Sequence, residues 1–76
     1  MMDLRLVRIF VAVVKHGSMT LAACELGLTQ SAVSQAVRQL EDALGTVLID
    51  RQRRPVGPTA AGSLLSARGA VLVEDA

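Results

Sequence analysis

The sequence predicts one small, mainly α-helical domain, and three observations support this. Apolar residues recur at spacings of three and four in separate segments, which places them on one side of an α-helix in each. A glycine follows each of the first three segments, where helices commonly end. Residues 46–58 lie between the third and fourth segments and are β-branched, basic and proline-containing, which predicts a short β-hairpin.

The first two helices are expected on either side of Gly17. Asp3 can cap the first, and its apolar stripe consists of Leu6, Ile9, Phe10, Val13 and Val14. Ser18 or Thr20 can cap a second, shorter helix, Met19–Leu26, which packs inward through Met19, Ala22, Ala23 and Leu26. Gly27 suits the left-handed residue that closes a helix, and Leu28 is expected to plug the following turn.

The third helix, over Thr29–Leu44, has two opposed faces and is the centre of the prediction. Its apolar side consists of Val33, Val37, Leu40 and Leu44. Its polar side consists of Ser31, Ser34, Gln35 and Arg38. Two helices joined by a short turn with a glycine form a helix-turn-helix. A generic helical hairpin is the alternative, and the polar face after the turn favours the helix-turn-helix.

The remaining chain predicts a wing and a further helix. Two short extended pieces surround the basic tip of residues 51–54, and Pro55 and Pro58 restrict the second piece to an edge or irregular strand. Thr59 can cap a fourth helix over residues 60–76. Gly62 and Gly69 would weaken that helix in isolation by roughly 1 kcal/mol each relative to alanine. The predicted fold class is therefore mainly α: a winged helix-turn-helix of three helices and a β-hairpin, followed by a linker helix.

Composition argues against a membrane protein and against an enzyme. The longest apolar run, Ile9–Val14, is too short to span a bilayer, and no secretion signal is expected at the N-terminus. Cys24 is the only cysteine, so we expect a cytoplasmic protein with no internal disulfide, and Cys24 itself at the core or its boundary. His16 is the only histidine, and Glu41 and Asp42 are expected to be solvated. We therefore predict no catalytic residues, no metal site and no cofactor.

The polar face of the third helix is suited to DNA. The major groove admits one α-helix, and residues in its N-terminal half reach the bases. Glutamine and serine can hydrogen-bond base edges, and arginine can neutralise phosphate. Solvated loops and simple helix capping are the competing interpretations for the wing and for Ser18 and Thr20. The full set of expected DNA-binding residues is Ser18, Thr20, Thr29, Gln30, Ser31, Ser34, Gln35, Arg38, Arg51, Arg53 and Arg54.

The sequence resembles the N-terminal DNA-binding domain of LysR-type transcriptional regulators over most of its length. Gly17-Ser18-Met19-Thr20 followed by Ala22-Ala23 resembles the family's G-S-(F)-T-x-A-A segment. Thr29-Gln30-Ser31-Ala32-Val33-Ser34 resembles its S-Q-(P/S)-A-(V/L)-S signature. Leu40-Glu41-x-x-Leu44-Gly45-x-x-Leu48 resembles its L-E-x-x-L-G-x-x-L run, and Thr59-x-Ala61-Gly62 its T-x-A-G start to the linker helix.

The resemblance implies more than the residues alone predict. It implies a dimer through the linker helix, with residues 1–58 as the DNA-binding domain and residues 59–76 as the start of the dimerisation helix. The dimerisation residues would be Ala60, Leu64, Leu65, Ala67, Val71 and Leu72. It also implies an effector-binding domain, absent from this chain, that would bind a small-molecule inducer.

Three positions depart from the family pattern. Gln35 stands where arginine is frequent, Ile49 where phenylalanine is usual, and Pro58 where leucine is usual, which is expected to loosen the second wing strand.

The predicted function is sequence-specific binding of a partly palindromic double-stranded DNA site by a homodimer. The recognition helix, about residues 31–44, would enter the major groove, and the wing would contact the minor groove or phosphates. The alternative is a winged helix that binds protein and not DNA, which the modest net charge of +1 favours.

Overall fold

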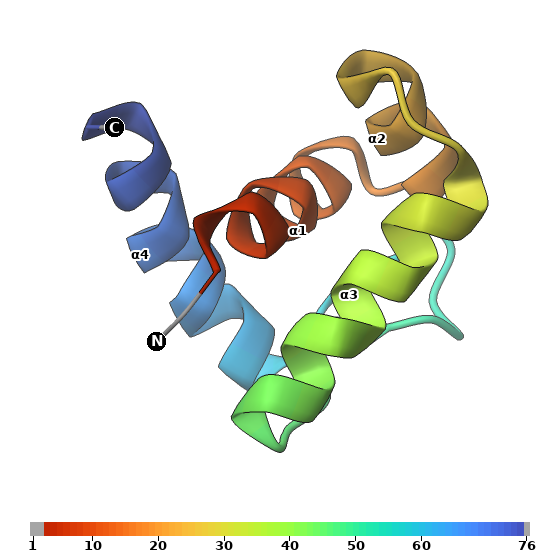
Figure 1. Cartoon of the computed structure of the whole chain (residues 1–76). Helices are drawn as coiled ribbons and strands as arrows, with labels where there is room; N and C mark the ends of the chain where they lie inside the picture. The colour runs from red at the N-terminus through yellow and green to blue at the C-terminus, as the bar shows by residue number, and fades with distance from the viewer. Residues whose placement is uncertain (1–2, 76) are drawn as a thin grey trace.

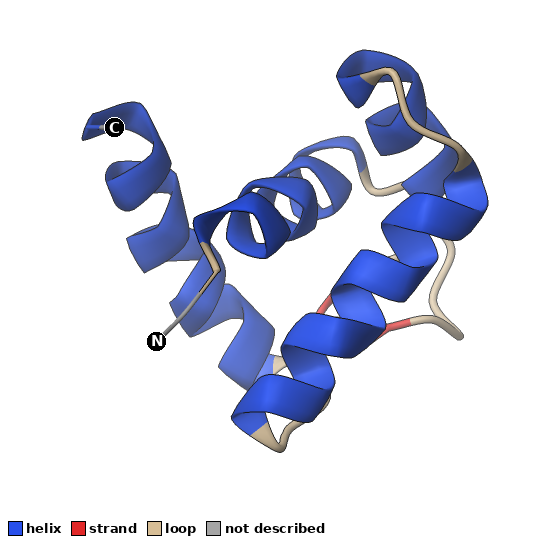
Figure 2. Cartoon of the chain, in the orientation of Figure 1, coloured by secondary structure: helices blue, strands red, loops and turns tan. Residues whose placement is uncertain are grey.

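The computed structural model describes the backbone of residues 3–75 and the side chains of residues 3–69, and it confirms the predicted fold class. In Figures 1 and 2 helices make up most of the molecule, and the two short strands lie behind α3 in this view. In chain order the elements are α1 (Leu4–His16), α2 (Met19–Leu26), α3 (Gln30–Leu44), β1 (Ile49–Asp50), β2 (Gly57–Pro58) and α4 (Ala60–Asp75).

The predicted helix boundaries agree with the observed caps. The side chains that cap α1, α2 and α3 each accept a hydrogen bond from a backbone N–H of the first turn; they belong to Asp3, Ser18 and Thr29. The three helices end at glycines with φ between 62° and 68°. At Gly27 this left-handed conformation turns the chain from α2 into α3 within three residues, which completes the helix-turn-helix.

Helix α1 is the centre of the core. It packs against α2, α3 and α4, and Figure 1 shows it between α4 on one side and the α2–α3 pair on the other. Phe10, the single aromatic residue, is fully buried with aliphatic neighbours from α3 and the wing, among them Val37, Leu40 and Leu48. Leu44 departs from the prediction: it is 41% exposed, because the core ends one turn earlier on α3.

The wing is shorter than the sequence predicted. Strands β1 and β2 pair antiparallel over two residues each, with Ile49 opposite Pro58 and Asp50 opposite Gly57. Pro58 therefore takes part in the second strand. The Val56 N–H donates to the Gly17 carbonyl at 3.1 Å, which ties the wing to the turn between α1 and α2.

Helix α4 approaches the rest of the domain closely at its two glycines. The Thr59 hydroxyl oxygen accepts from the Gly62 N–H at 3.1 Å, and this caps α4 as predicted. A Cβ added at Gly62 would overlap the carbonyl oxygen of Leu48, and one added at Gly69 would lie 2.7 Å from a Val7 methyl. The sequence indicated these glycines only as a weakness of the helix, whereas the structure shows them where the backbone needs space.

We predict that Gly62→Ala lowers the free energy of unfolding by about 1–3 kcal/mol, the usual cost of overpacking a fitted contact. Helix propensity alone would give the opposite sign, because alanine favours a helix by about 1 kcal/mol over glycine. Chemical denaturation monitored by circular dichroism measures the change, with the exposed neighbour Ser63→Ala as the control. A Gly62→Ala variant more stable than the wild type would contradict the close approach of α4 to Leu48.

Candidate nucleic-acid interface

One hollow in the surface brings together most of the predicted DNA-binding residues. It lies between the start of α2, the N-terminal half of α3 and the wing. Seven predicted residues line it: Ser18, Thr20, Gln30, Ser34, Arg38, Arg51 and Arg54. They come from three segments of the chain, and together they offer amides and hydroxyls beside three guanidinium groups. Such a surface can hydrogen-bond a polar ligand and neutralise an anion at once.

The other four predicted residues lie outside this hollow. The Thr29 hydroxyl oxygen accepts from the Ala32 N–H at 3.0 Å and so acts as the cap of α3. Ser31 is exposed on the outer side of α3. Arg53 folds back over the wing, where its guanidinium lies against Gly57. Gln35 is exposed and lines a different hollow, described next.

A second, more apolar hollow lies between α1, the turn after α2, and α3. Gln35 and Gln39 line it from α3, and Arg5 and Arg8 from α1. Leu28 also lines it and is 41% exposed, so the expectation that Leu28 plugs the turn is wrong. Gln35 therefore lies at the edge of the exposed polar face of α3, on the side away from the wing.

The three wing arginines, which the sequence grouped as equivalent tip cations, have three different placements. Arg54 donates from Nη1 to the carbonyl oxygens of Arg51 and Arg53, and this closes the tip of the wing. Arg53 covers Gly57. Arg51 turns toward α3, where its Nη2 lies 3.7 Å from a carboxylate oxygen of Glu41.

Glu41 was expected to be solvated, and the structure places it differently. Its side chain is only 14% exposed, and Oε2 accepts hydrogen bonds from the N–H groups of Leu48 at 2.8 Å and Ile49 at 3.3 Å. Its fellow acid Asp42 is exposed as expected. A signal was present, because Glu41 follows the buried Val37 by four residues and so lies on the same side of α3. Cys24, expected at the core or its boundary, is exposed on α2.

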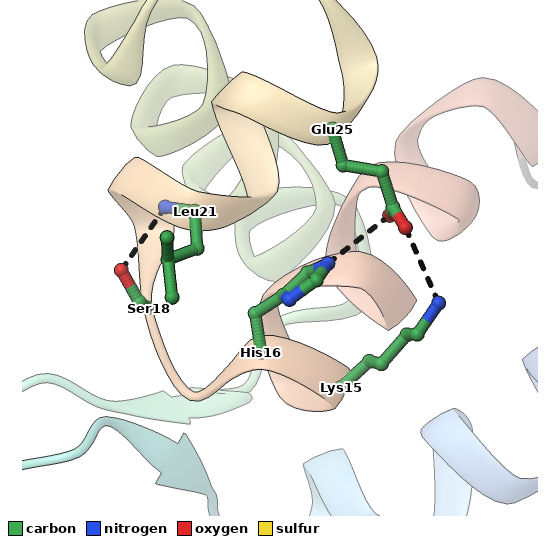
Figure 3. Close-up of polar contacts among 5 residues, drawn as sticks. All are labelled: Lys15, His16, Ser18, Leu21 and Glu25. Atoms are coloured by element: carbon green, nitrogen blue, oxygen red, sulfur yellow. Dashed lines mark hydrogen bonds and ion pairs between the residues drawn. The ribbon is translucent and has the colours of Figure 1, made fainter.

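Helix α2 is fixed to the end of α1 by the carboxylate of Glu25. Lys15 donates to Oε1 at 3.2 Å, and His16 Nε2 lies 3.4 Å from Oε2, as Figure 3 shows. The hydrogen bond from Lys15, and then the nearby His16 imidazole, lowers the pKa of the Glu25 carboxyl below its usual range. This clamp lies at the end of α2, whereas at its start the Ser18 oxygen accepts from the Leu21 N–H at 3.1 Å. The Ser18 hydroxyl hydrogen remains available to a ligand.

The part of the chain that the structure describes offers little to other kinds of site. Within it, no three histidine, cysteine, aspartate or glutamate side chains gather as metal ligands would. None of its helices combines the length and the hydropathy that crossing a membrane requires.

Comparison with known proteins gives one consistent result. The family model for bacterial regulatory helix-turn-helix proteins of the lysR family matches residues 4–63. The transcriptional regulator AbaB of Streptomyces antibioticus is 51% identical over 69 residues, which is 91% of this chain and 23% of AbaB. The RuBisCO operon transcriptional regulator of Allochromatium vinosum is 52% identical over 60 residues, 79% of this chain and 20% of that protein. The chain thus spans about a fifth of the length of these relatives.

Solved structures agree with this match. The complex of the BenM DBD with benA site 1 DNA superposes with a TM-score of 0.93 at 38% identity, over 97% of this chain and 83% of that one. The CbnR DBD–DNA complex superposes with a TM-score of 0.89 at 33% identity, over 96% of this chain and 84% of that one. Vibrio fischeri DarR in complex with DNA superposes with a TM-score of 0.92 at 29% identity, over 99% of this chain and 26% of that one.

We predict that the Glu25 clamp makes stability depend on pH in acid. The folded protein holds the Glu25 pKa below its unfolded value, so the stabilisation is complete above the unfolded pKa and is lost as the pH falls through the folded pKa. The melting temperature of the wild type should therefore exceed that of Glu25→Gln at pH values above the unfolded pKa of the carboxyl, and the difference should shrink as the pH falls below it. Asp42→Asn is the control, and a difference that grows on acidification would contradict the clamp.

Proposed function

The chain belongs to the lysR family of bacterial regulatory helix-turn-helix proteins, and on that premise we propose that it binds double-stranded DNA as the DNA-binding domain of a transcriptional regulator. The observation that carries the proposal is the hollow in which seven predicted residues from α2, α3 and the wing meet. Solved relatives in DNA complexes support DNA as the ligand. They weigh against the alternative of a winged helix that binds protein and not DNA.

In this proposal α3 lies in the major groove and supplies the sequence reading. The groove is about 12 Å wide and accepts one helix, N-terminal end first. Gln30 and Ser34 face the groove floor from the wing side, Ser31 from the middle of the exposed face, and Gln35 from its far edge. Each can exchange hydrogen bonds with base edges, and glutamine can pair with adenine through two bonds.

The cations and the remaining hydroxyls hold the backbone in the proposed complex. Arg38 lies one turn beyond the reading residues, where a phosphate would pass. Ser18, Thr20 and Thr29 contact phosphates at the starts of α2 and α3, where the helix dipoles also attract anions. Arg51, Arg53 and Arg54 place the wing against the minor groove or its phosphates.

Two copies would bind together through α4, with residues 1–58 as the reading domain and residues 59–76 as the start of the dimer seam. Ala60, Leu64 and Ala67 are exposed along one side of α4, with Leu64 60% exposed, which supports a partner there. Leu65 is half-buried against the domain's own core, which reduces its share in the seam. The proposed contacts of the Val71 and Leu72 side chains lie outside the described residues. A symmetric dimer reads a partly palindromic site through helices about 34–36 Å apart.

The first prediction from this proposal separates phosphate contact from base reading. Arg54→Ala should flatten the dependence of log affinity on log salt by about one unit and leave the preference among sequences unchanged. Fluorescence anisotropy with duplex DNA over a salt series measures the slope. Arg68→Ala, which removes an exposed cation of α4, is the matched control and should not change the slope.

Gln30→Ala should have the opposite pattern of effects. It should alter the preference among DNA sequences in a selection from random duplexes, and it should change the salt dependence of affinity little. Gln39→Ala is its control, since Gln39 lies on the same helix in the other hollow. Indistinguishable effects of the Arg54 and Gln30 variants would overturn this division of roles. A wild-type chain that fails to shift random duplex DNA even at low salt would overturn DNA binding itself.

The last prediction of this section concerns the dimer. Burying a leucine stabilises an interface by about 1.5–3 kcal/mol, and a symmetric seam contains two copies of each residue. Leu64→Glu should therefore raise the dimer dissociation constant by about two orders of magnitude or more. Sedimentation velocity measures it, with Leu21→Glu as the control because Leu21 is similarly exposed, at 54%, on α2. Equal sedimentation of the two variants would remove α4 as the seam.

A further inference from the structure

Arg51 differs from the other cations of the hollow in having an acid directly behind it. Its side chain is 32% exposed, its Nη2 atom is buried, and the nearest acid is Glu41 of α3, 3.7 Å from that atom. Arg51 also lines the hollow, together with Arg38 and Arg54. Arg51 is therefore held from the protein side and open on the other side.

Glu41 uses its two carboxylate oxygens for two different contacts. Oε2 accepts from the backbone N–H groups of Leu48 and Ile49, at the point where the chain enters the wing. Oε1 faces Arg51. One partly buried side chain of α3 thus contacts both the start of the wing and the cation that the wing presents.

We propose that Glu41 is a positioning residue for DNA binding, which holds the Arg51 guanidinium at the hollow so that a phosphate meets a cation already in place. The inference rests on the proposed function. A guanidinium has five N–H donors, so contact with Glu41 on one side leaves donors for a phosphate on the other. Ordering a long side chain opposes binding, and here Arg51 is ordered when the domain folds.

Glu41 could instead weaken DNA binding, so the direction in which affinity changes when its charge is removed decides between the two roles. If Glu41 merely competed with phosphate for Arg51, or repelled the duplex, removing its charge would strengthen binding. Glu41→Gln removes the charge but keeps an oxygen that can accept from the Leu48 N–H, so the start of the wing is retained. Asp42→Asn removes the same charge from the adjacent, exposed position and measures general repulsion alone.

The experiment titrates a duplex of random sequence with the 76-residue chain over a salt series, at a temperature where melting curves show each variant folded. Glu41→Gln should bind about 2- to 10-fold more weakly than Asp42→Asn, the range expected when one side chain must be ordered on binding. Arg51→Gln should flatten the salt slope by about one unit. Adding Glu41→Gln to Arg51→Gln should change the affinity little, because the two residues act through one contact.

Three outcomes would overturn the inference. Glu41→Gln could bind as tightly as Asp42→Asn, or weaken binding equally with and without Arg51, which would make its role purely structural. Arg51→Gln could leave the salt slope of DNA affinity unchanged. This measurement tests the inference even if Glu41→Gln does not fold. None of these overturns DNA binding itself, which fails only if the wild type does not bind duplex DNA and the Arg54 variant therefore has no slope to lose.

Discussion

The rest of the structure depends on the backbone of Leu48. Its N–H is bound by the Glu41 carboxylate from α3, and its carbonyl accepts from the Thr59 N–H at 3.0 Å, just before α4 begins. Gly62 brings the α4 backbone against the same carbonyl, and the Leu48 side chain is buried in the core. The recognition helix, the wing and the linker helix therefore all meet at one residue.

Hydrogen bonds at Leu48 fix the relative orientation of the segments, which an apolar core alone cannot do. Burial of aliphatic side chains drives the helices together but is not directional, and a domain of this size buries only a modest core. The placement of the wing instead depends on short contacts with defined geometry. Glu41 of α3 accepts from the Leu48 N–H, and Val56 donates to the Gly17 carbonyl in the turn between α1 and α2. The Glu25 clamp does the same for α2, so each of the three segments around the hollow is positioned by polar contacts.

The sequence predicted what is local and missed what depends on tertiary contact. Helix boundaries were predictable because caps and glycines act within a few residues, and the apolar stripes identified most of the core. The hydrogen-bond partners of Glu41, the separate placements of Arg51, Arg53 and Arg54, and the location of Gln35 in a second hollow were not. Each depends on which segment lies opposite, and spacing along one helix does not encode this. Gly62 shows the same limit, because its cost to an isolated helix conceals its role at the contact with Leu48.

The placement of charge, more than its sum, reconciles a net charge of +1 with a polyanionic ligand. Four of the acids have internal tasks: Asp3 caps α1, Glu25 clamps α2, Glu41 holds the start of the wing, and Asp50 accepts from the Gln52 N–H. Three arginines meanwhile line one hollow. Fields at a surface depend on nearby charges, since salt screens those beyond about 10 Å. The Thr29–Leu44 stretch thus presents a nearly uncharged polar face, with cations at its edge on Arg38 and on the wing.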